Sequence, residues 1–507
     1  MTRDGAVILA HDLGTTGDKA TLTSADGALL AAASVPYPAH FGAGGKAEQS
    51  AEDWWRAVCH ATRLLLSERP GIERDIAAVS FSGQMMGAVL LDDAGAPVRP
   101  AIIWADTRAV DEARLLVDRF GMREAYRVTG HRFNATYSLP KVMWVRAHEP
   151  DVFARTRHIV LAKDFVVHRL TGRFATDPSD ASSTNAFDQA AGDWSDAILD
   201  AADVPRALFP EVLPSTSVIG GVTREAADAC GLLAGTPVVL GGGDGPMAAL
   251  GAGIVGPDSG AYAYLGSSSW VSLAATAPLH DDAMRTMTFN HVVPGMFVPT
   301  ATMQAGGASL QWITEVLVPS GDRRYESLLD EAADVEASAE DLYFLPHLLG
   351  ERSPYWNPAA RAAFVGLARH HTRAHLVRAV LEGVAFNLRT GLQAFAENGS
   401  PATRIDAIGG AAHSDLLLRL FADTWGVPVT RRSLVDEATS LGAAVVGGVG
   451  VGVFDDFAIG ARLSERSRPV DPDPARHGAY ALAHERFLDA YARLEPWFDA
   501  STSSISE

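Results

Sequence analysis

The sequence predicts an α/β protein built from two related lobes. An apolar strand over residues 7–10 leads into the turn Asp12-Leu13-Gly14-Thr15-Thr16, and a second strand over 261–265 leads into a similar turn, Gly266-Ser267-Ser268-Ser269. Apolar runs typical of strands alternate with helical patterns in both halves of the chain, which favours mixed sheets covered by helices. A glycine-rich stretch over 251–260 has the composition of a connection between domains. We therefore expect an N-terminal lobe over 1–255 and a C-terminal lobe over 256–507.

The first half contains the signals of a sheet with a covering helix. Residues 6–37 alternate apolar runs with turns, which predicts a meander of strands. Residues 51–66 have apolar side chains at helical spacing, including two adjacent tryptophans. Two further buried strands are predicted over 76–81 and 238–240, and the second of them ends in three glycines followed by an aspartate.

The second half repeats this arrangement. A strand over 261–265 opens it, a long amphipathic helix is predicted over 375–392, and a strand over 405–408 ends in a glycine pair. The recurrence of strand, turn and helix in both halves is the basis for expecting two related lobes.

Composition limits the classes of function. The chain has 507 residues, 47% of them hydrophobic, so it can bury large cores in about two or three domains. Its formal net charge of −19 argues against nucleic acid or an anionic membrane as the main partner, although local donors can still bind a nucleotide. Cys59 and Cys230 are the two cysteines, too few for a disulfide framework or a cysteine-based zinc site. With no signal-like or membrane-spanning apolar run, we expect a soluble cytoplasmic protein.

The two glycine-hydroxyl turns are candidate phosphate-binding hairpins. Glycine lets backbone N–H groups approach a phosphate closely, and hydroxyls add donors without bulk. Either turn alone is more often a simple hairpin. The pair predicts that Thr15, Thr16, Gly266 and Ser267 hold one polyphosphate between the lobes.

Two aspartates at strand ends are the candidate catalytic residues. Asp244 follows a predicted strand, at the edge of an α/β sheet where ligand sites gather. There it could accept the proton of an attacking hydroxyl, or it could equally be a helix N-cap before Pro246. Asp12, beside the first hairpin, could hold Mg²⁺ between phosphates, or it could stabilise the turn.

Residues after the strand over 76–81 suit a sugar or polyol. Amide and guanidinium groups bind paired hydroxyls, while thioether and indole groups cover C–H faces. The alternative is that the methionines and the tryptophan are core residues. The candidate substrate-binding residues, with Asp244, are Gln84, Met85, Met86, Trp104 and Arg108.

Two glycine pairs that lead into helices are candidates for the nucleotide. Each pair would let the backbone lie against a purine or a ribose, although a tight strand–helix turn is the common alternative. The pairs are Gly306-Gly307, followed by Gln311, and Gly409-Gly410, followed by Ala411 and Ser414.

Taken in order, these turns resemble the FGGY family of carbohydrate kinases. The most specific likeness is the segment 362–367, then seven residues, then 375–382, which agrees with the second signature of the family; the first signature is matched more loosely over 141–144. The resemblance extends from about residue 6 to about residue 453. It implies the two-lobed actin-like ATPase fold of the sugar kinase–Hsp70–actin superfamily, with ribonuclease H-like sheets. It also implies ATP with Mg²⁺ and a small sugar or polyol as substrate.

Within the family, the chain is most similar to the xylulokinases. The likeness lies in Glu48-Gln49 and in the segments 82–85, 103–108 and 349–355. By this resemblance Asp244 matches the catalytic base, and Asp12 the carboxylate beside the metal and phosphates. Other positions match the phosphate hairpins and the nucleotide site of the related glycerol kinases: Thr15, Ser267, Gly307, Gln311, Gly410 and Ser414. Ser414 stands where the family has asparagine.

Two departures concern the sugar. Met86 stands where xylulokinases have histidine, and Gly245 where they tend to have asparagine. Both changes remove a polar group, which relaxes or redirects discrimination between substrates. D-Xylulose or a related pentulose is the leading expectation, with erythritol, ribulose and gluconate as alternatives. A non-catalytic nucleotide-binding regulator is a third option, against which both aspartates argue. The sequence leaves the oligomeric state open, a homodimer included.

Overall fold

The computed structural model describes residues 5–318, 320, 324–433 and 437–503. In this structure the first half of the chain builds a seven-stranded sheet with the order β14-β15-β6-β1-β2-β3, to which β16 adds beside β6. β1 pairs antiparallel with β2 and parallel with β6. The strands are β1 (Val7–Leu13), β2 (Gly17–Ser24), β3 (Leu29–Pro36), β6 (Ile76–Gly83), β14 (Val218–Gly221), β15 (Pro237–Val239) and β16 (Gly242–Gly243).

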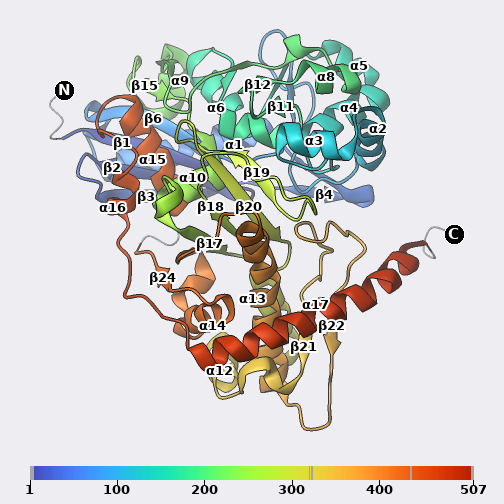
Figure 1. The fold of residues 1–507 in the computed structure, drawn as a ribbon. Helices are drawn as coiled ribbons and strands as arrows, with labels where there is room; N and C mark the ends of the chain where they lie inside the picture. The colour runs from blue at the N-terminus through green and yellow to red at the C-terminus, as the bar shows by residue number, and fades with distance from the viewer. Residues whose placement is uncertain (1–4, 319, 321–323, 434–436, 504–507) are drawn as a thin grey trace.

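The second half builds a six-stranded sheet with the order β19-β20-β18-β17-β23-β24. Its strands are β17 (Ala261–Leu265), β18 (Ser269–Leu273), β19 (Met287–Asn290), β20 (Phe297–Met303), β23 (Ile405–Ile408) and β24 (Val429–Arg431). β17 pairs antiparallel with β18 and parallel with β23, the same pattern that β1 makes with β2 and β6. The two related lobes expected from the turns are therefore present (Figure 1).

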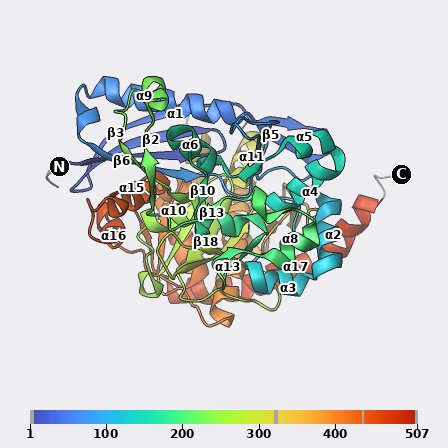
Figure 2. The ribbon, with the colours of Figure 1, turned by 90° about the horizontal axis from the view of Figure 1, so that it is seen from above.

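Helices cover both faces of the first sheet. Because successive side chains of a strand point to opposite faces, Val7 and Leu9 pack with α1 (Ala51–Glu68), while Ile8 and Ala10 pack with α10 (Asp244–Gly251) and α15 (Ala438–Gly450). Figure 2 shows α1 and α15 on opposite sides of these strands. α15 follows the second sheet in the chain but packs against β1 and β6 of the first.

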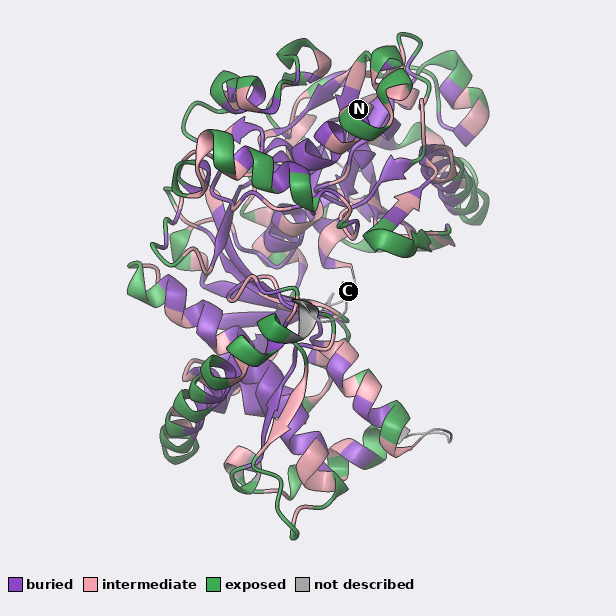
Figure 3. Cartoon of the chain, turned by 90° about the vertical axis from the view of Figure 1, so that its right-hand side faces the viewer, coloured by how far each residue is buried: buried purple, intermediate pink, exposed green. Residues whose placement is uncertain are grey.

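The second lobe is organised around the long helix α13 (Arg373–Glu397), which contains the predicted helix over 375–392. Figure 3 shows the buried residues along the sheets and the inner sides of the helices, with the exposed residues on the outer sides. The other helices of this half are α11 (Gly307–Leu317), α12 (Arg324–Ala333), α14 (Asp415–Trp425), α16 (Ile459–Leu463) and α17 (Pro474–Ser503). Short strands β21 (Tyr343–Leu345) and β22 (Ala363–Val365) pair with each other.

A helical region with its own hydrophobic core extends the first lobe. Its helices include α2 (Val110–Phe120), α3 (Met122–Thr129), α4 (Ser138–His148), α5 (Pro150–Arg155) and α8 (Asp196–Ala202). Near it lie α6 (Ala162–Thr171), α7 (Pro178–Ala181), α9 (Arg224–Cys230), β7 (Val89–Leu91), β8 (Ala101–Ile102) and β9 (His158–Val160). Within the described ranges, no helix combines the length and apolar character needed to cross a bilayer.

Candidate active site

A cavity of about 430 Å³ brings together residues of both lobes. From the first lobe it is lined by both candidate catalytic aspartates, the first hairpin and part of the expected sugar wall: Asp12, Thr15, Met85, Met86, Trp104 and Asp244. From the second lobe it is lined by the second hairpin, aromatic side chains and one arginine: Ser267, Trp270, Met287, Phe289 and Arg352. The two turns that are far apart in the sequence thus face one space.

Asp244 lies where the first sheet ends and α10 begins. β16 pairs with the end of β6, and the next residue, Asp244, is the first of the helix, with Gly243 at the N-cap position. The carboxylate therefore does not cap the helix; its Oδ1 accepts a hydrogen bond from the N–H of Gly245 at 2.8 Å. Burial, and next the charge of Asp12, raise the pKa of Asp244 to about 7. A carboxylate with a pKa near neutrality is suited to accept a proton.

Asp12 belongs to β1 itself, opposite Lys19 of β2, and not to an Asx turn. Its Oδ1 accepts a hydrogen bond from the hydroxyl of Ser82 at 2.9 Å, and burial raises its pKa to about 6. No cluster of three or more His, Cys, Asp or Glu side chains that could hold a metal occurs in the described part of the chain. Mg²⁺ is commonly bound by one or two carboxylates together with phosphates and water. Asp12 and Asp244, as oxygen donors beside the hairpins, fit an ion that arrives with a nucleotide.

The predicted sugar wall is formed by Met85, Met86 and Trp104. The indole N–H of Trp104 donates to the hydroxyl of Thr15 at 2.8 Å, which joins this wall to the first hairpin. Met86 has a φ of 61°, a left-handed conformation that is uncommon for a residue other than glycine. The thioether and indole groups give the cavity apolar surfaces suited to the C–H faces of a sugar.

The predicted nucleotide residues border a second hollow of about 880 Å³, which meets the cavity at Ser267. Gly307 packs so closely on the second hairpin that a Cβ there would lie 2.7 Å from the carbonyl oxygen of Gly266. Ser414 caps α14, with its hydroxyl oxygen accepting a hydrogen bond from the N–H of Leu417. Thr15 and Thr16, also expected at the nucleotide, line the first cavity instead. The other expected nucleotide positions line this hollow: Gly266, Ser267, Gly307, Gln311, Gly410, Ala411 and Ser414.

Comparison with known sequences decides the family. Residues 7–251 match the N-terminal domain, and residues 261–451 the C-terminal domain, of the FGGY family of carbohydrate kinases. The chain belongs to this family. This FGGY kinase is 33% identical to the xylulose kinase of Escherichia coli (strain K12), over 96% of this chain and 98% of the relative. It is 29% identical to the gluconokinase of Bacillus subtilis (strain 168), over 89% of this chain and 88% of the relative.

Solved structures of sugar kinases have the same fold. The xylulose kinase from Rhodospirillum rubrum is 30% identical, with a TM-score of 0.89, over 97% of this chain and 100% of that chain. The gluconate kinase from Lactobacillus acidophilus is 25% identical, with a TM-score of 0.91, over 96% of this chain and 98% of that chain. The predicted two-lobed actin-like ATPase fold is thereby confirmed, and this FGGY protein is an ATP-dependent carbohydrate kinase.

Two expected sugar-binding residues do not line the cavity of the kinase. The amide of Gln84 donates to the side-chain oxygen of Gln49 at 2.8 Å and to the carbonyl of Gly14 at 3.3 Å. The guanidinium of Arg108 forms ion pairs with Asp106 at 2.6 Å and Glu48 at 2.7 Å. The amide nitrogen of Gln84 and the guanidinium of Arg108 are thus engaged by neighbours, whereas Oε1 of Gln84 is buried without a partner among the described residues. Contact of these two residues with a sugar stays a prediction, and neither lines the cavity.

Lys141, on α4, connects the two segments that carry the wall residues with a third segment at Thr136. Its fully buried ammonium donates to the carbonyl oxygens of Met86, Ile103 and Thr136 at 2.8, 2.8 and 2.5 Å. The N–H of Met86 in turn donates to the hydroxyl of Ser183 at 3.0 Å. Burial lowers the pKa of Lys141 to about 7, while its three carbonyl contacts favour the charged form. The kinase thus holds the backbone at Met86 from both sides.

A second buried lysine, Lys163, is linked through Asp177 and Ser179 to Gly243, the residue before Asp244. The ammonium of Lys163 contacts carboxylates of Asp164, Asp177 and Asp180, at 2.5, 3.1 and 3.3 Å. Asp177 accepts a hydrogen bond from Ser179, whose oxygen accepts one from the N–H of Gly243 at 3.0 Å. This network holds the strand end that precedes the candidate catalytic residue Asp244.

Arg352 lines the cavity, although no role for it was predicted from the sequence. It follows β21 in the second lobe, and its guanidinium lies 4.0 Å from the sulfur of Met86 and 5.7 Å from the ring centroid of Trp104, both in the first lobe. Lys141 was likewise given no role. Both residues occur in segments that resemble the family, and this resemblance was the one feature of the sequence that could have pointed to them. Their contacts could not be predicted, because the partners are far away in sequence.

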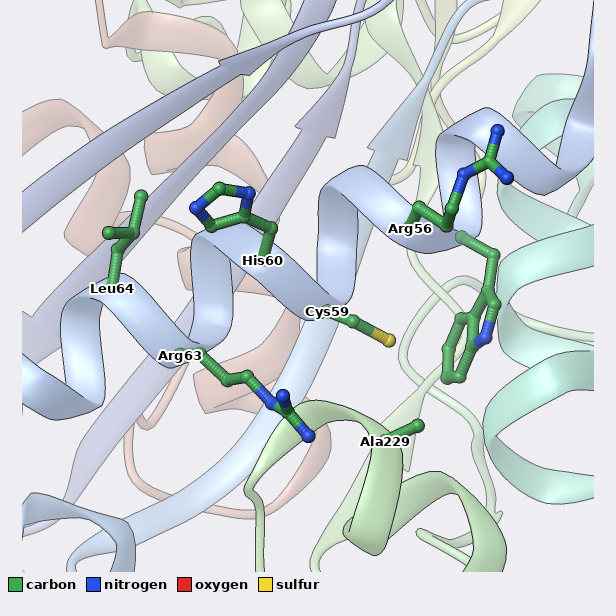
Figure 4. A pocket seen from close by; sticks show the side chains of 7 residues that line it. Arg56, Cys59, His60, Arg63, Leu64 and Ala229 are labelled. Atoms are coloured by element: carbon green, nitrogen blue, oxygen red, sulfur yellow. The ribbon is translucent and has the colours of Figure 1, made fainter.

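A further hollow, of about 590 Å³, lies on the outer face of α1 against α9 (Figure 4). Its arginines have partners, since Arg63 donates to the carbonyl of Asp228 and Arg56 pairs with Asp53. It contains neither hairpin nor either candidate catalytic aspartate, so it is separate from the candidate active site.

Proposed function

We propose that this kinase transfers the γ-phosphoryl group of ATP, bound with Mg²⁺, to a hydroxyl of a pentulose, with D-xylulose as the preferred substrate. The observation that carries the proposal is that Asp244, both hairpins and an apolar wall line one cavity. The identity with xylulose kinases over nearly the whole chain supports the choice of sugar.

Each group of residues around the cavity has a separate role in the proposed reaction. Asp244 accepts the proton of the attacking hydroxyl, which an aspartate with a pKa near 7 can do at neutral pH. Mg²⁺ would neutralise the charge that develops between the phosphates, with Asp12 as its protein ligand. Backbone N–H groups of the two hairpins, at Thr15, Thr16, Ser267 and Ser268, hold the phosphates. Met86, Trp104 and Trp270 exclude water and so limit hydrolysis of ATP.

A sugar acid such as gluconate is the second candidate. It is favoured by the gluconate kinase whose structure superposes with a TM-score of 0.91. Met86 and Gly245, which replace polar residues expected in xylulokinases, also weaken the case for strict recognition of D-xylulose. A polyol such as erythritol and the pentulose ribulose stay alternatives.

An ADP-release assay across pentuloses, hexuloses, tetritols and aldonates tests the proposal. The expected result is the highest kcat/KM with D-xylulose. A higher kcat/KM with gluconate would transfer the assignment to the second candidate. Release of ADP that no member of the panel stimulates would contradict sugar kinase activity on these classes.

The division into lobes over 1–255 and 256–507, the cytoplasm as location and a homodimer as assembly state are further parts of the proposal. The net charge of −19 supports a small free sugar, and not nucleic acid or a membrane surface, as the substrate class.

A further inference from the structure

We propose that Arg352 is a substrate-binding residue, supplied by the second lobe, whose guanidinium donates hydrogen bonds to oxygens of the sugar. This inference rests on the proposed function and extends it, since it assigns part of the recognition of the sugar to the lobe that binds the nucleotide. The ligand chemistry is that of acceptor oxygens, either the hydroxyls of a ketose or the carboxylate of an aldonate.

The position of Arg352 is the first reason. It lies in the connection between β21 and β22, within the second lobe, yet it faces a cavity that also contains Asp244. Its guanidinium approaches the sulfur of Met86 and the ring of Trp104 across the space between the lobes. A cation at this place borders the wall of the first lobe and the reacting carboxylate at once.

The second reason is that, among the described residues, the guanidinium is left without an oxygen partner: its Nη1 donates to the sulfur of Met86, a weak acceptor, and its Nε has no partner. Within the described ranges no carboxylate lies within ion-pair distance of Arg352, and its Nε–H is buried without a hydrogen-bond partner. The adjacent Glu351 is engaged elsewhere: it accepts from the N–H of Gln304 at 3.0 Å and from the amide of Asn387 at 3.2 Å. A guanidinium has five N–H donors, and leaving a buried donor unpaired is costly. Oxygens of a bound substrate would satisfy them.

A comparison with Arg108 sharpens this point. Arg108 also lies near the wall, but two carboxylates pair with it and it does not line the cavity. Among the described residues that line the cavity, Arg352 is the basic one; the remainder are acidic, hydroxyl-bearing, small or apolar. Burial lowers the pKa of Arg352, and the nearby carboxylates of Glu351 and Asp244 offset this only in part. The cationic hydrogen-bond donor of the cavity, the guanidinium of Arg352, therefore comes from the second lobe.

The test uses the full-length kinase and two substitutions, R352Q and R352K. R361Q is the matched control, because Arg361 follows in the same connection but is exposed and bonds only to nearby carbonyls. For each variant, kcat and the KM values for sugar and ATP are measured with D-xylulose and with D-gluconate, together with the melting temperature.

We expect R352Q to raise KM for the sugar by about 10- to 100-fold, the range for a lost hydrogen bond to a charged group. KM for ATP should stay within about twofold of the wild type, and R352K should recover part of the loss. A loss with both substrates identifies hydroxyls as the ligand, and a loss confined to gluconate identifies the carboxylate.

Two results would overturn the inference. One is an unchanged KM for sugar in R352Q. The other is an equal rise of both KM values with a lower melting temperature, which would mean that Arg352 only supports the fold. A wild type that phosphorylates neither sugar nor any other member of the panel would reject the proposed function, and this inference with it, whatever the variants do.

Discussion

The cavity proposed to bind the sugar and the hollow proposed to bind the nucleotide are built in opposite ways. In the cavity, Met85 and Met86 are each 6% exposed, and the backbone behind them is tied by buried polar side chains. In the hollow, Gln311 and Gly410 are exposed, and the amide of Gln311 bonds only to Glu315 of the same helix.

From this difference we expect the selectivity between substrates to reside in the cavity. A backbone held in place by buried partners cannot shift to fit a different ligand, so a wrong substrate is poorly accommodated. Glycine-rich backbone approaches phosphates and ribose without reading a particular base. We therefore expect substitutions around the cavity to have larger effects than substitutions around the hollow.

The largest effect is expected for D244N, which retains the shape of the side chain and removes the proton acceptor. We expect kcat to fall by about 10²- to 10⁴-fold, while KM for ATP and the melting temperature stay close to the wild type. In the wild type, kcat/KM should fall as the pH drops below about 7, because protonation of Asp244 removes the base. A variant with more than half of the wild-type kcat would exclude Asp244 from this role.

D12N should have the next largest effect, a decrease of about 10²-fold in kcat with MgATP, since the positioned charge beside the phosphates is lost. It also tests the coupling of the two aspartates. Because the charge of Asp12 raises the pKa of Asp244, the low-pH limb of kcat/KM should move to lower pH in this variant. An unmoved limb and wild-type kcat would make Asp12 a structural residue of β1.

M86H tests the sugar wall itself. If Met86 faces the sugar, the imidazole should raise kcat/KM for D-xylulose relative to gluconate by the equivalent of about 1–2 kcal/mol, one added hydrogen bond. The two substrates are compared on the same protein, and the melting temperature is the control. An unchanged ratio with a lower melting temperature would show that the imidazole is buried without a partner.

The smallest effect is expected for S414N on the nucleotide side. Asparagine caps a helix about as well as serine, so α14 should keep its stability. The longer side chain can reach the base, and KM for ATP should fall by a few-fold, with KM for the sugar unchanged. A change in the sugar KM larger than that in the ATP KM would contradict the separation of the two regions.

The sequence predicted the parts of the molecule that depend on local signals. The two hairpins, the strand ends that carry Asp12 and Asp244, and the long helix α13 follow from apolar periodicity and from glycine placement. It did not predict which polar side chains near a strand end face the cavity. Gln84 is turned away by Gln49, a partner in a different strand, and no pattern within the segment 82–87 reveals that contact.

Lys141 and Arg352 were missed for the same reason. Lys141 reaches carbonyls of three separate segments, and Arg352 crosses from one lobe to the other. α15 follows the second sheet in sequence but packs on the first, which requires the close approach of Gly442 to the carbonyl of Met247. Such contacts are decided by tertiary packing between residues that are distant in the chain.

The backbone at Met86, held through its N–H by Ser183 and through its carbonyl by Lys141, has a consequence for evolution. Neither tie involves the side chain of residue 86, so a single codon change can alter the chemistry facing the sugar while the loop stays in position. The left-handed φ of 61° restricts which replacements are tolerated, and histidine and asparagine are among the residues that adopt it most readily. Replacement of this one residue, by an amino acid that tolerates the left-handed conformation, is therefore expected to change substrate preference while the fold is kept.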